Sequence, residues 1–400
     1  MEMKKYKLGE ICRIASARRI FENEYVAAGI PFIRGQEVSD GSLTNPKSKF
    51  QCYISKKRFE ELKKEYGIPK KGDILITAVG TIGNLCYLDK DIDFYFKDGN
   101  LIWFSDFKED ILSEYLYFFM KGDYFKKQLN HTLIGAVQKA LTMEKLSKIE
   151  IIVPPLPTQQ KIAAVLSSLD KKIALNSRIN ARLEQMAKRL YEHYFVQFDF
   201  PTADGKPYKT SGGKMVYSSE LKREIPEGWE VKRLGELNVV SRGTTITQKQ
   251  TTKGNIKVVA GGLTYSYTNG ESNRRKNCIT VSGSGENAGF VNFWREPIFA
   301  SDCSTVQFED DFDTIICYFN LKMHEHIFFR NSHKSAQPHV YPSDIKEIPF
   351  VIPPKEVKEK IKDLFLKAND KIAILQQESA RLTSLRDRLL PLLMNGQVSV

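Results

Sequence analysis

The sequence lacks the patterns that secretion, disulfide cross-linking and structural zinc require. Its six cysteines include no Cys-x-x-Cys pair and have no histidine at zinc-finger spacing, which argues against a disulfide framework and a structural zinc site. The first residues carry no apolar core of a signal peptide, and no apolar run approaches the length that a bilayer requires. We therefore expect a soluble protein of the reducing cytoplasm.

Signatures of the common catalytic classes are missing as well. The sequence has no P-loop, no His-Glu-x-x-His, no Gly-x-Ser-x-Gly and no Asn-Pro-Pro-aromatic tetrapeptide of adenine N6-methyltransferases. The loop Val281–Gly289 follows an expected strand, but its glycines are spaced G-x-G-x-x-x-G and Phe290–Trp294 reads as another strand. This favours a tight turn over a dinucleotide or S-adenosylmethionine site. We therefore expect no catalytic residue, no metal ligand and no cofactor on this chain.

The balance of charge is strongly basic. Sixty lysines and arginines stand against 48 aspartates and glutamates, a formal net charge of +12 over 400 residues. A chain of this length usually forms two or more domains. The excess of positive charge suits a polyanionic partner such as nucleic acid, although a soluble basic protein without such a partner has the same composition.

The second half of the chain repeats the first. Pro154-Pro155 and Pro353-Pro354 each end a β-branched run and begin a helical pattern, and the two pairs lie 199 positions apart. At the same offset, Lys172-Ile173-Ala174 is repeated as Lys371-Ile372-Ala373. We expect the α+β class, with mixed α/β modules, short strands and an internal pseudo-twofold repeat. The predicted boundaries are a module at 1–153, a helix at 154–197, a linker or extended arm at 198–230, a module at 231–352 and a helix at 353–400.

Each long helix carries one narrow apolar stripe. At about 38 residues each, the helices are roughly 57 Å long, and such a stripe needs a partner. We predict that the two helices pair as an antiparallel coiled coil; the alternatives are that each packs on its own module, or that the stripes dock helices of other subunits. Asn176 and Asn180 are polar residues in the first stripe, where they fix register at a cost in stability. The positions predicted to pair are Ile162, Leu166, Leu169, Ile173, Asn176, Asn180, Leu183 and Leu190 in the first helix and Ile361, Phe365, Ile372, Leu375, Leu382 and Leu389 in the second.

Polar, basic and aromatic residues gather in loops of both modules. Arginine and lysine neutralise phosphates, arginine reads guanine edges, and asparagine and glutamine read adenine edges. Any one of these side chains, taken singly, is more often an ordinary solvated side chain, so the clusters carry the argument. The candidates in the first module are Arg13, Arg18, Arg19, Arg34, Gln36, Lys56, Lys57, Arg58 and Thr77. Those in the second are Arg242, Thr244, Thr245, Gln248, Tyr265, Tyr267, Arg274, Arg275, Ser282, Ser284, Asn287, Gln337 and His339.

Several stretches taken in order resemble the specificity (S) subunits of Type I restriction-modification systems, the HsdS family. The resemblance covers essentially the whole chain and includes both Pro-Pro helix starts. The other stretches that carry it are Leu8-Gly-Glu-Ile, Gly29-Ile-Pro-Phe-Ile-Arg-Gly, Lys71-Gly-Asp-Ile-Leu, Phe195-Val-Gln-Phe-Asp-Phe-Pro, Ile225-Pro-Glu-Gly-Trp-Glu-Val, Ala336-Gln-Pro-His and Leu389-Leu-Pro-Leu-Leu-Met-Asn-Gly.

This resemblance implies two target-recognition domains, each reading one half of a split DNA site, with the helix pair as a ruler that sets the gap. It also implies a non-catalytic subunit. Two methyltransferase subunits would bring S-adenosylmethionine, and restriction and translocase subunits, where present, would bring ATP and Mg. The first module has Val137-Gln-Lys-Ala where the second has Ala336-Gln-Pro-His, and the contact loops differ throughout, so we expect two unlike half-sites.

Two other functions remain open at this level. A self-contained S-adenosylmethionine-dependent DNA adenine methyltransferase would use the loop at Gly283, and a coiled-coil scaffold would assemble proteins without binding DNA. Cofactor binding by the chain alone would indicate the first, and an assembled complex that does not bind duplex DNA would indicate the second.

Overall fold

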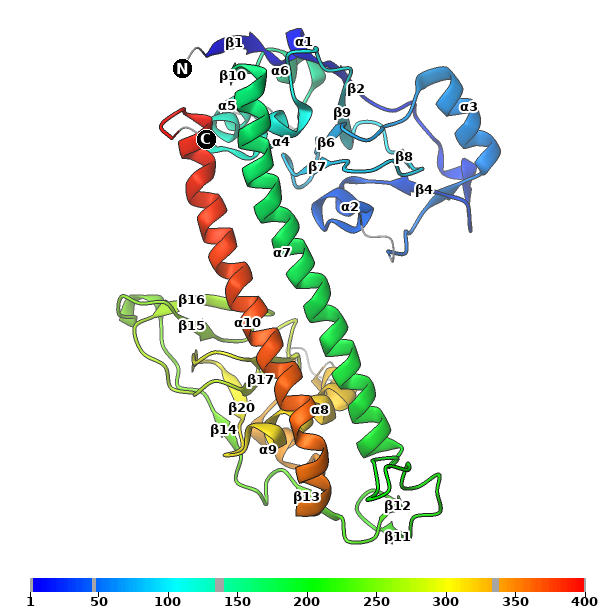
Figure 1. The fold of residues 1–400 in the computed structure, drawn as a ribbon, viewed down its shortest axis with the longest axis vertical. Coiled ribbons are helices and arrows are strands. Elements are labelled where there is room, and N and C mark those ends of the chain that lie inside the picture. The colour runs from blue at the N-terminus through cyan, green and yellow to red at the C-terminus, as the bar shows by residue number, and fades with distance from the viewer. Residues whose placement is uncertain (1–2, 45–47, 134–139, 333–337, 399–400) are drawn as a thin grey trace. The chain divides into compact units, whose positions relative to one another are not determined.

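A computed structural model describes residues 3–44, 48–133, 140–332 and 338–398. The chain divides into two compact units, one formed by Met1–Ile173 with Ala380–Val400 and the other by Ala174–Ser379. Each unit contains one module together with segments of two long helices, α7 (Leu156–Tyr191) and α10 (Lys355–Met394), which Figure 1 shows in green and in orange to red.

The first module is built on an antiparallel sheet of order β2-β9-β6-β7. Its central strand β6 is buried along its whole length, because the run Ile-Leu-Ile-Thr is apolar on both faces. The strands of this sheet are β2 (Arg13–Ala15), β9 (Leu101–Ser105), β6 (Ile74–Thr77) and β7 (Leu85–Tyr87). A second sheet has the order β3-β5-β4-β8, with β3 (Tyr25–Val26), β5 (Tyr53–Ile54), β4 (Ile30–Ile33) and β8 (Tyr95–Phe96).

Short helices complete the first module. The helix α4 buries Tyr115, Phe118 and Phe119 in the main core of the unit. The helices are α1 (Leu8–Ile11), α2 (Gly35–Ser39), α3 (Lys56–Tyr66), α4 (Ser113–Lys121), α5 (Asp123–Leu133) and α6 (Met143–Ser147), with 3₁₀ turns η1 (Glu22–Glu24) and η2 (Ser42–Thr44).

The second module repeats this topology. Its antiparallel sheet has the order β14-β20-β17-β18, which matches β2-β9-β6-β7 strand for strand. The parallel pair β15 and β19 corresponds to the parallel pair β4 and β8. The strands are β14 (Val240–Arg242), β20 (Cys303–Val306), β17 (Cys278–Ser282), β18 (Val291–Trp294), β15 (Ile256–Val259), β16 (Tyr265–Asn269) and β19 (Ile298–Ala300). The helices are α8 (Asp311–Ser332) and α9 (Pro342–Lys346), with the 3₁₀ turn η4 (Gln248–Gln250).

The repeated Leu-Gly-Glu motif performs the same task in both modules. The amide of Leu8 donates to the carbonyl of Ile149 at 2.9 Å, and the amide of Leu234 donates to the carbonyl of Ile348 at 3.0 Å. A Cβ on the following glycine, Gly9 in the first module, would lie only 2.8 Å from the Cβ of the helix residue beside it, and at Gly235 the distance would be 3.0 Å. The glycine therefore allows the chain to pass close to α6 in one module and to α9 in the other.

The first and last strands of each module pair with each other. β1 (Lys4–Lys7) lies antiparallel to β10 (Glu150–Val153), and β13 (Glu230–Arg233) lies antiparallel to β21 (Pro349–Ile352). After β10 and β21 come the two proline pairs and then α7 and α10, because the proline ring is tolerated where a strand ends and a helix begins.

The two long helices both contribute to the core of each unit. In the unit that holds the first module, Ile162 and Leu166 near the start of α7 share a core with Leu390 and Leu393 near the end of α10. In the other unit, the end of α7 and the start of α10 share a core. The start of each long helix therefore packs on its own module, and its end packs in the core of the other unit, which differs from the alternative that each helix packs on its own module alone. After α7 the chain makes one π-helical turn, Glu192–Val196.

The segment 198–230, expected as a linker or extended arm, is packed rather than loose. Phe198, Phe200 and Trp229 are buried in the core of the second unit, and the ring centroids of Phe200 and Trp229 are 5.0 Å apart. The segment also forms a hairpin of β11 (Met215–Ser218) and β12 (Arg223–Pro226). Its glycines, prolines and lysines suggest a loop, but the interspersed aromatic side chains bury enough apolar surface to hold it in place.

Candidate nucleic-acid interface

Three segments of the second module meet around one cleft. Arg242 ends β14, Ser284 lies in the turn after β17, and His339 precedes α9. The amide of Val340 donates to the carbonyl of Gly283 at 3.0 Å, which ties the last two segments together in a short antiparallel bridge. The structure thus brings together three of the predicted contact residues, which lie far apart in the sequence.

The cleft combines hydrogen-bond donors with an acceptor. Arg242 lies 3.5 Å from Asp302, and their side chains are 66% and 46% exposed, so the ion pair is weak and solvated. The hydroxyl of Ser284 donates to Asp302 at 3.3 Å, and the rings of His339 and Tyr341 stack with centroids 5.9 Å apart. The cleft, of about 160 Å³, is lined by Arg242, Gly283, Ser284, Asp302, Cys303, Ser304, His339, Val340, Tyr341 and Pro342.

The turn at Val281–Gly289 forms one wall of this cleft and is tight, as predicted. The amide of Gly289 donates back to the carbonyl of Ser282 at 2.9 Å, and Gly285 and Gly289 have positive φ angles of 78° and 92°. β18 follows directly, so no helix begins at the end of the loop. The glycines serve the turn and do not form a phosphate-binding loop.

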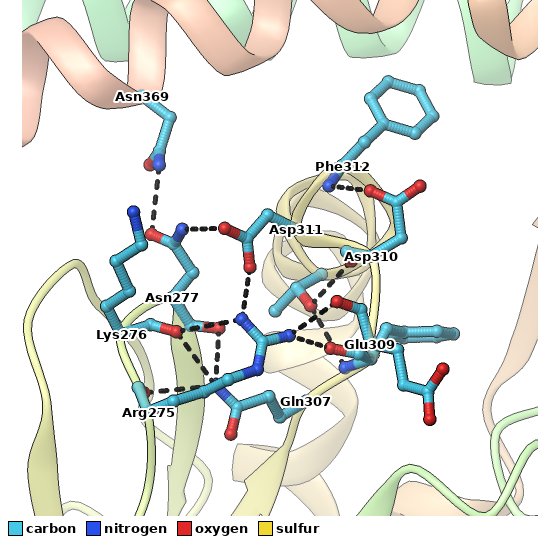
Figure 2. Close-up of polar contacts among 11 residues, drawn as sticks. Arg275, Lys276, Asn277, Gln307, Glu309, Asp310, Asp311, Phe312 and Asn369 are labelled. Atoms are coloured by element: carbon cyan, nitrogen blue, oxygen red, sulfur yellow. Dashed lines mark hydrogen bonds and ion pairs between the residues drawn. The ribbon is translucent and has the colours of Figure 1, made fainter.

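Arg274 and Arg275 are engaged within the module. Arg274 donates to the hydroxyls of Thr305 and Ser241, each at 3.0 Å, and to the carbonyl of Arg242. Figure 2 shows Arg275 held by the carboxylate of Asp311 and by the backbone carbonyls that precede it. Both guanidinium groups therefore hold strands and loops together, and neither is directed only to solvent.

The remaining candidates of the second module divide into exposed and interior residues. Thr244, Thr245, Gln248 and Tyr265 are exposed, and Asn287 and Tyr267 are half-buried. Tyr267 donates its hydroxyl to the carbonyl of Ile246 at 2.6 Å, and Lys257 lies 5.4 Å from the centre of the Tyr265 ring. Ser282 is buried, and Gln337 lies outside the described residues.

In the first module the arginines are largely paired with carboxylates. Arg58 pairs with Glu24 and Glu61, and Arg19 with Asp98. Arg34 contacts Glu37 and donates to the side chain of Gln51, and Arg13 lies 3.8 Å from Asp106. The side chains of Arg13 and Arg19 remain exposed in these pairs, and those of Arg18, Gln36, Lys56 and Lys57 are exposed as well.

Thr77 has a structural position. It is 1% exposed, and its hydroxyl accepts from the amide of Asn84 at 2.9 Å in the turn between β6 and β7. A Cβ on Gly35 would lie 3.6 Å from Thr77, so the start of α2 rests against this turn. Gln36 follows Gly35 and therefore lies next to this turn. Gly262 holds the equivalent position in the second module, the third residue after β15.

The predicted helix-pairing positions vary in burial. Ile162, Leu166, Asn176, Ile361, Phe365, Ile372 and Leu375 are buried, and Leu169, Ile173, Asn180, Leu183, Leu190, Leu382 and Leu389 are half-buried. The amide of Asn176 donates to Glu378 at 2.8 Å. Within the described residues, the side-chain oxygens of Asn176 and Asn180 are buried without a hydrogen-bond partner.

Asp302 and Tyr341 are cleft residues that the sequence did not indicate. Asp302 is a single acidic residue beside a strand, and Tyr341 follows the Gln-Pro-His stretch that carries the family resemblance. Only the meeting of three distant segments identifies them. Over the ranges that the structure describes, no three His, Cys, Asp or Glu side chains are grouped as a metal site would need, and no helix is long and apolar enough to cross a membrane.

Comparisons with known proteins agree with this arrangement. The family model described as "Type I restriction modification DNA specificity domain" matches residues 1–185 and again 226–384. The Type I restriction enzyme MjaIX specificity subunit of Methanocaldococcus jannaschii is 27% identical over 400 residues, which cover 94% of this chain and 88% of that protein.

Two further matches cover nearly the whole chain. The Type I restriction enzyme HindI specificity subunit of Haemophilus influenzae is 24% identical, covering 99% of this chain and 100% of the relative. The crystal structure of the S subunit of a Type I restriction-modification system from M. genitalium superposes with a TM-score of 0.64 at 14% identity, covering 98% of this chain and 96% of the other. At that identity, the structural match supports the fold.

Proposed function

This chain belongs to the family of Type I restriction-modification DNA specificity domains, and we propose that it reads a bipartite, asymmetric DNA site with one module on each half. Its role is sequence-specific DNA recognition. The observation that carries the bipartite reading is the repeated topology, in which one sheet order is built twice with different side chains at equivalent places. Where β4 of the first module is followed by Arg34-Gly35-Gln36, β15 of the second is followed by Ala260-Gly261-Gly262.

We propose that the cleft at Arg242 is part of the reading surface of the second module. An arginine donates to the O6 and N7 atoms of guanine, and a carboxylate accepts from the N4 amino group of cytosine. Arg242 and Asp302 are exposed enough to exchange their mutual contact for contacts with a base pair at little cost. In the first module, Arg18, Gln36, Lys56 and Lys57 would supply phosphate and base contacts.

We propose further that α7 and α10 pair as an antiparallel coiled coil that separates the modules and relates them by a pseudo-twofold axis. Support comes from each unit separately: the start of α7 shares a core with the end of α10, and the end of α7 shares a core with the start of α10. The contact between Asn176 and Glu378 adds a polar link at a buried position. A fixed helix length would then fix the gap between the half-sites.

The same helices offer matching positions for partner subunits. Leu175 and Met186 on α7 are 45% and 43% exposed, and Ile374 and Leu385, at the same places in the repeat, are 58% and 46% exposed. Exposed apolar side chains at repeated positions are typical of an interaction surface. Two equivalent surfaces suit two copies of one partner, which we propose to be methyltransferase subunits.

We propose that this subunit is non-catalytic. S-adenosylmethionine would be bound by the methyltransferase subunits, and ATP and Mg by restriction and translocase subunits where these join the complex. A self-contained methyltransferase is not favoured, because the Gly283 loop is a tight turn followed by β18. A scaffold without DNA binding is not favoured either, because the chain belongs to a DNA specificity family.

The experiment that tests this proposal is modification sequencing of a genome exposed to the reconstituted complex. We expect methylated adenines in one motif with two unlike half-sites and a gap of constant length. A palindromic or continuous methylated motif would count against the bipartite reading. Methylation by this chain alone, without a partner subunit, would contradict the non-catalytic role.

A further inference from the structure

A half-buried polar junction joins the first module to both long helices. The carboxylate of Asp170 in α7 accepts from Lys121 at the end of α4 at 3.3 Å and from Arg386 in α10 at 2.7 Å. The three side chains are 27%, 28% and 21% exposed, so the junction is only partly reached by water. One carboxylate therefore connects the module, its own helix and the second helix.

A second junction performs the same task in the other unit. Asn369 in α10 is 5% exposed, accepts from the Nε of Arg295 at 2.8 Å, and donates to Asn277 at 3.0 Å. Arg295, whose side chain is 9% exposed, in turn lies 3.4 Å from Glu184 in α7. Asn369 therefore joins the second module to α10, and Arg295 extends the same junction to α7.

The two junctions occupy the same position in the repeat. Asp170 and Asn369 are 199 positions apart, the offset that relates the two Pro-Pro pairs. The chemistry differs, with a carboxylate between two cations in one copy and an amide that both donates and accepts in the other. In both copies this position therefore makes a polar contact to the module that precedes the helix, although the partners are unrelated.

The second junction extends into the loop that enters β17. Figure 2 shows Asn369 reaching from the helix to Asn277, whose amide donates to Asp311 at 2.7 Å. Asn277 has a φ of +59°, a conformation that asparagine tolerates better than most residues. Gln307 donates to the carbonyls of residues 275–277, at 3.0–3.2 Å. The far end of β17 leads into the turn that carries Ser284, so the helix contact is continuous with the candidate reading surface.

We propose that Asp170 and Asn369 are positioning residues that fix the angle at which each recognition module is mounted on the helices, and thereby hold the gap between the half-sites constant. The inference rests on the proposed reading of a bipartite site. Apolar packing is non-directional and tolerates sliding, whereas hydrogen bonds and ion pairs of defined geometry select one arrangement. Since neighbouring base pairs are about 3.4 Å apart, a shift of a few ångströms brings a module to the next base pair.

The test uses Asp170→Asn and Asn369→Leu in the full chain, each assembled with its methyltransferase partner. Asp170→Glu, which keeps the charge, is the conservative variant, and Asp363→Asn, which removes an exposed ion pair with Lys367 on α10, is the matched control. The readout is modification sequencing. We expect both half-site sequences to be retained while methylation at gaps one base pair longer or shorter rises about tenfold relative to the wild-type gap, equivalent to about 1.4 kcal/mol. Asp170→Glu and Asp363→Asn should keep the strict gap.

A strict gap in both junction variants would overturn the proposal, as would an altered half-site with an unaltered gap. A second measurement is independent of DNA: pulsed electron paramagnetic resonance distances between spin labels introduced at the exposed positions Lys57 and Lys249 of the isolated full chain. We expect a broader distance distribution in Asp170→Asn and Asn369→Leu than in Asp363→Asn. An unchanged distribution would refute the mounting role, whereas a wild-type complex that methylates no bipartite motif would refute the proposed function alone.

Discussion

The side-chain amide of Asn176 in α7 donates a hydrogen bond to the carboxylate of Glu378 in α10, with 2.8 Å between Nδ2 and Oε2. Asn176 is fully buried, and its oxygen has no partner among the described residues, so the residue costs stability where it lies. In the other copy of the repeat, the same position is the buried Leu375.

Replacing Asn176 by leucine should therefore stabilise the second unit by about 1 kcal/mol, because a buried polar atom without a partner is removed. The midpoint of thermal unfolding should rise by about 2–4 °C. The reverse change at the equivalent position, Leu375→Asn, is the control and should destabilise the unit by about 2 kcal/mol or more. A loss of stability in Asn176→Leu would mean that its bond to Glu378 outweighs the unpaired oxygen.

Alanine substitutions of Arg242 and Arg274 should separate an effect on DNA binding from an effect on the free energy of unfolding. Arg242→Ala should change the free energy of unfolding by less than about 0.5 kcal/mol, because its ion pair is exposed. The same variant should weaken DNA binding by the assembled complex by about 1–3 kcal/mol, with base preference changed in one half-site.

Arg274→Ala should instead destabilise the second module by about 2 kcal/mol, because it removes the bonds that link β14 to β20. Urea unfolding of the chain and DNA titrations of the complex measure the two effects. Equal loss of stability in both variants would remove the distinction between a reading residue and a structural one.

The lengths of α7 and α10 should control the number of base pairs between the two half-sites. Inserting seven residues in the middle of α7 and seven at the matching place in α10 keeps the heptad register and adds about 10.5 Å, close to three base pairs. Modification sequencing should show a gap longer by about three base pairs with both half-sites unchanged. An insertion of three residues in each helix is the control and should disrupt assembly, because it turns the apolar stripes away from their partners.

The cysteines should react very unequally with iodoacetamide. Burial raises the pKa of the Cys12, Cys86, Cys278 and Cys303 thiols from the ordinary 9.0 to about 12, and raises that of Cys317 as well. The reactive thiolate is thus about a thousandfold scarcer in these residues than in a thiol with an ordinary pKa. At pH 8, mass spectrometry should find the first alkylation at the half-buried Cys52. Unfolding in urea should make all six equally reactive, and early labelling of Cys278 or Cys303 would contradict the packing of the second module.

The architecture could be predicted from the sequence because its signals are local or periodic. The 199-residue offset and the apolar stripes identify the repeat and the two long helices without knowledge of any distant contact. The tight turn at Val281–Gly289 follows from glycine spacing alone. The packed segment at 198–230 was missed because composition does not show that Phe200 and Trp229 lie against each other.

How each candidate contact residue is engaged could not be predicted from the sequence, for a physical reason. Whether an arginine faces solvent or a neighbour depends on residues that the fold brings near. Arg274 is taken up by Ser241 and Thr305, more than thirty positions away in either direction. Arg242 remains exposed beside Asp302, although both arginines look alike in the sequence.

The pairing of β1 with β10, and of β13 with β21, makes each module a closed insert whose two ends lie side by side in one ladder. An exchange of the intervening residues for those of another module leaves both ends of the ladder and the following helix in place. On the proposed bipartite reading, substituting the residues between the paired strands of one module would change one half-site preference and leave the other module unchanged. On that reading the molecule would hold two interchangeable recognition modules, and its range of targets would grow as the product of the modules available at each place.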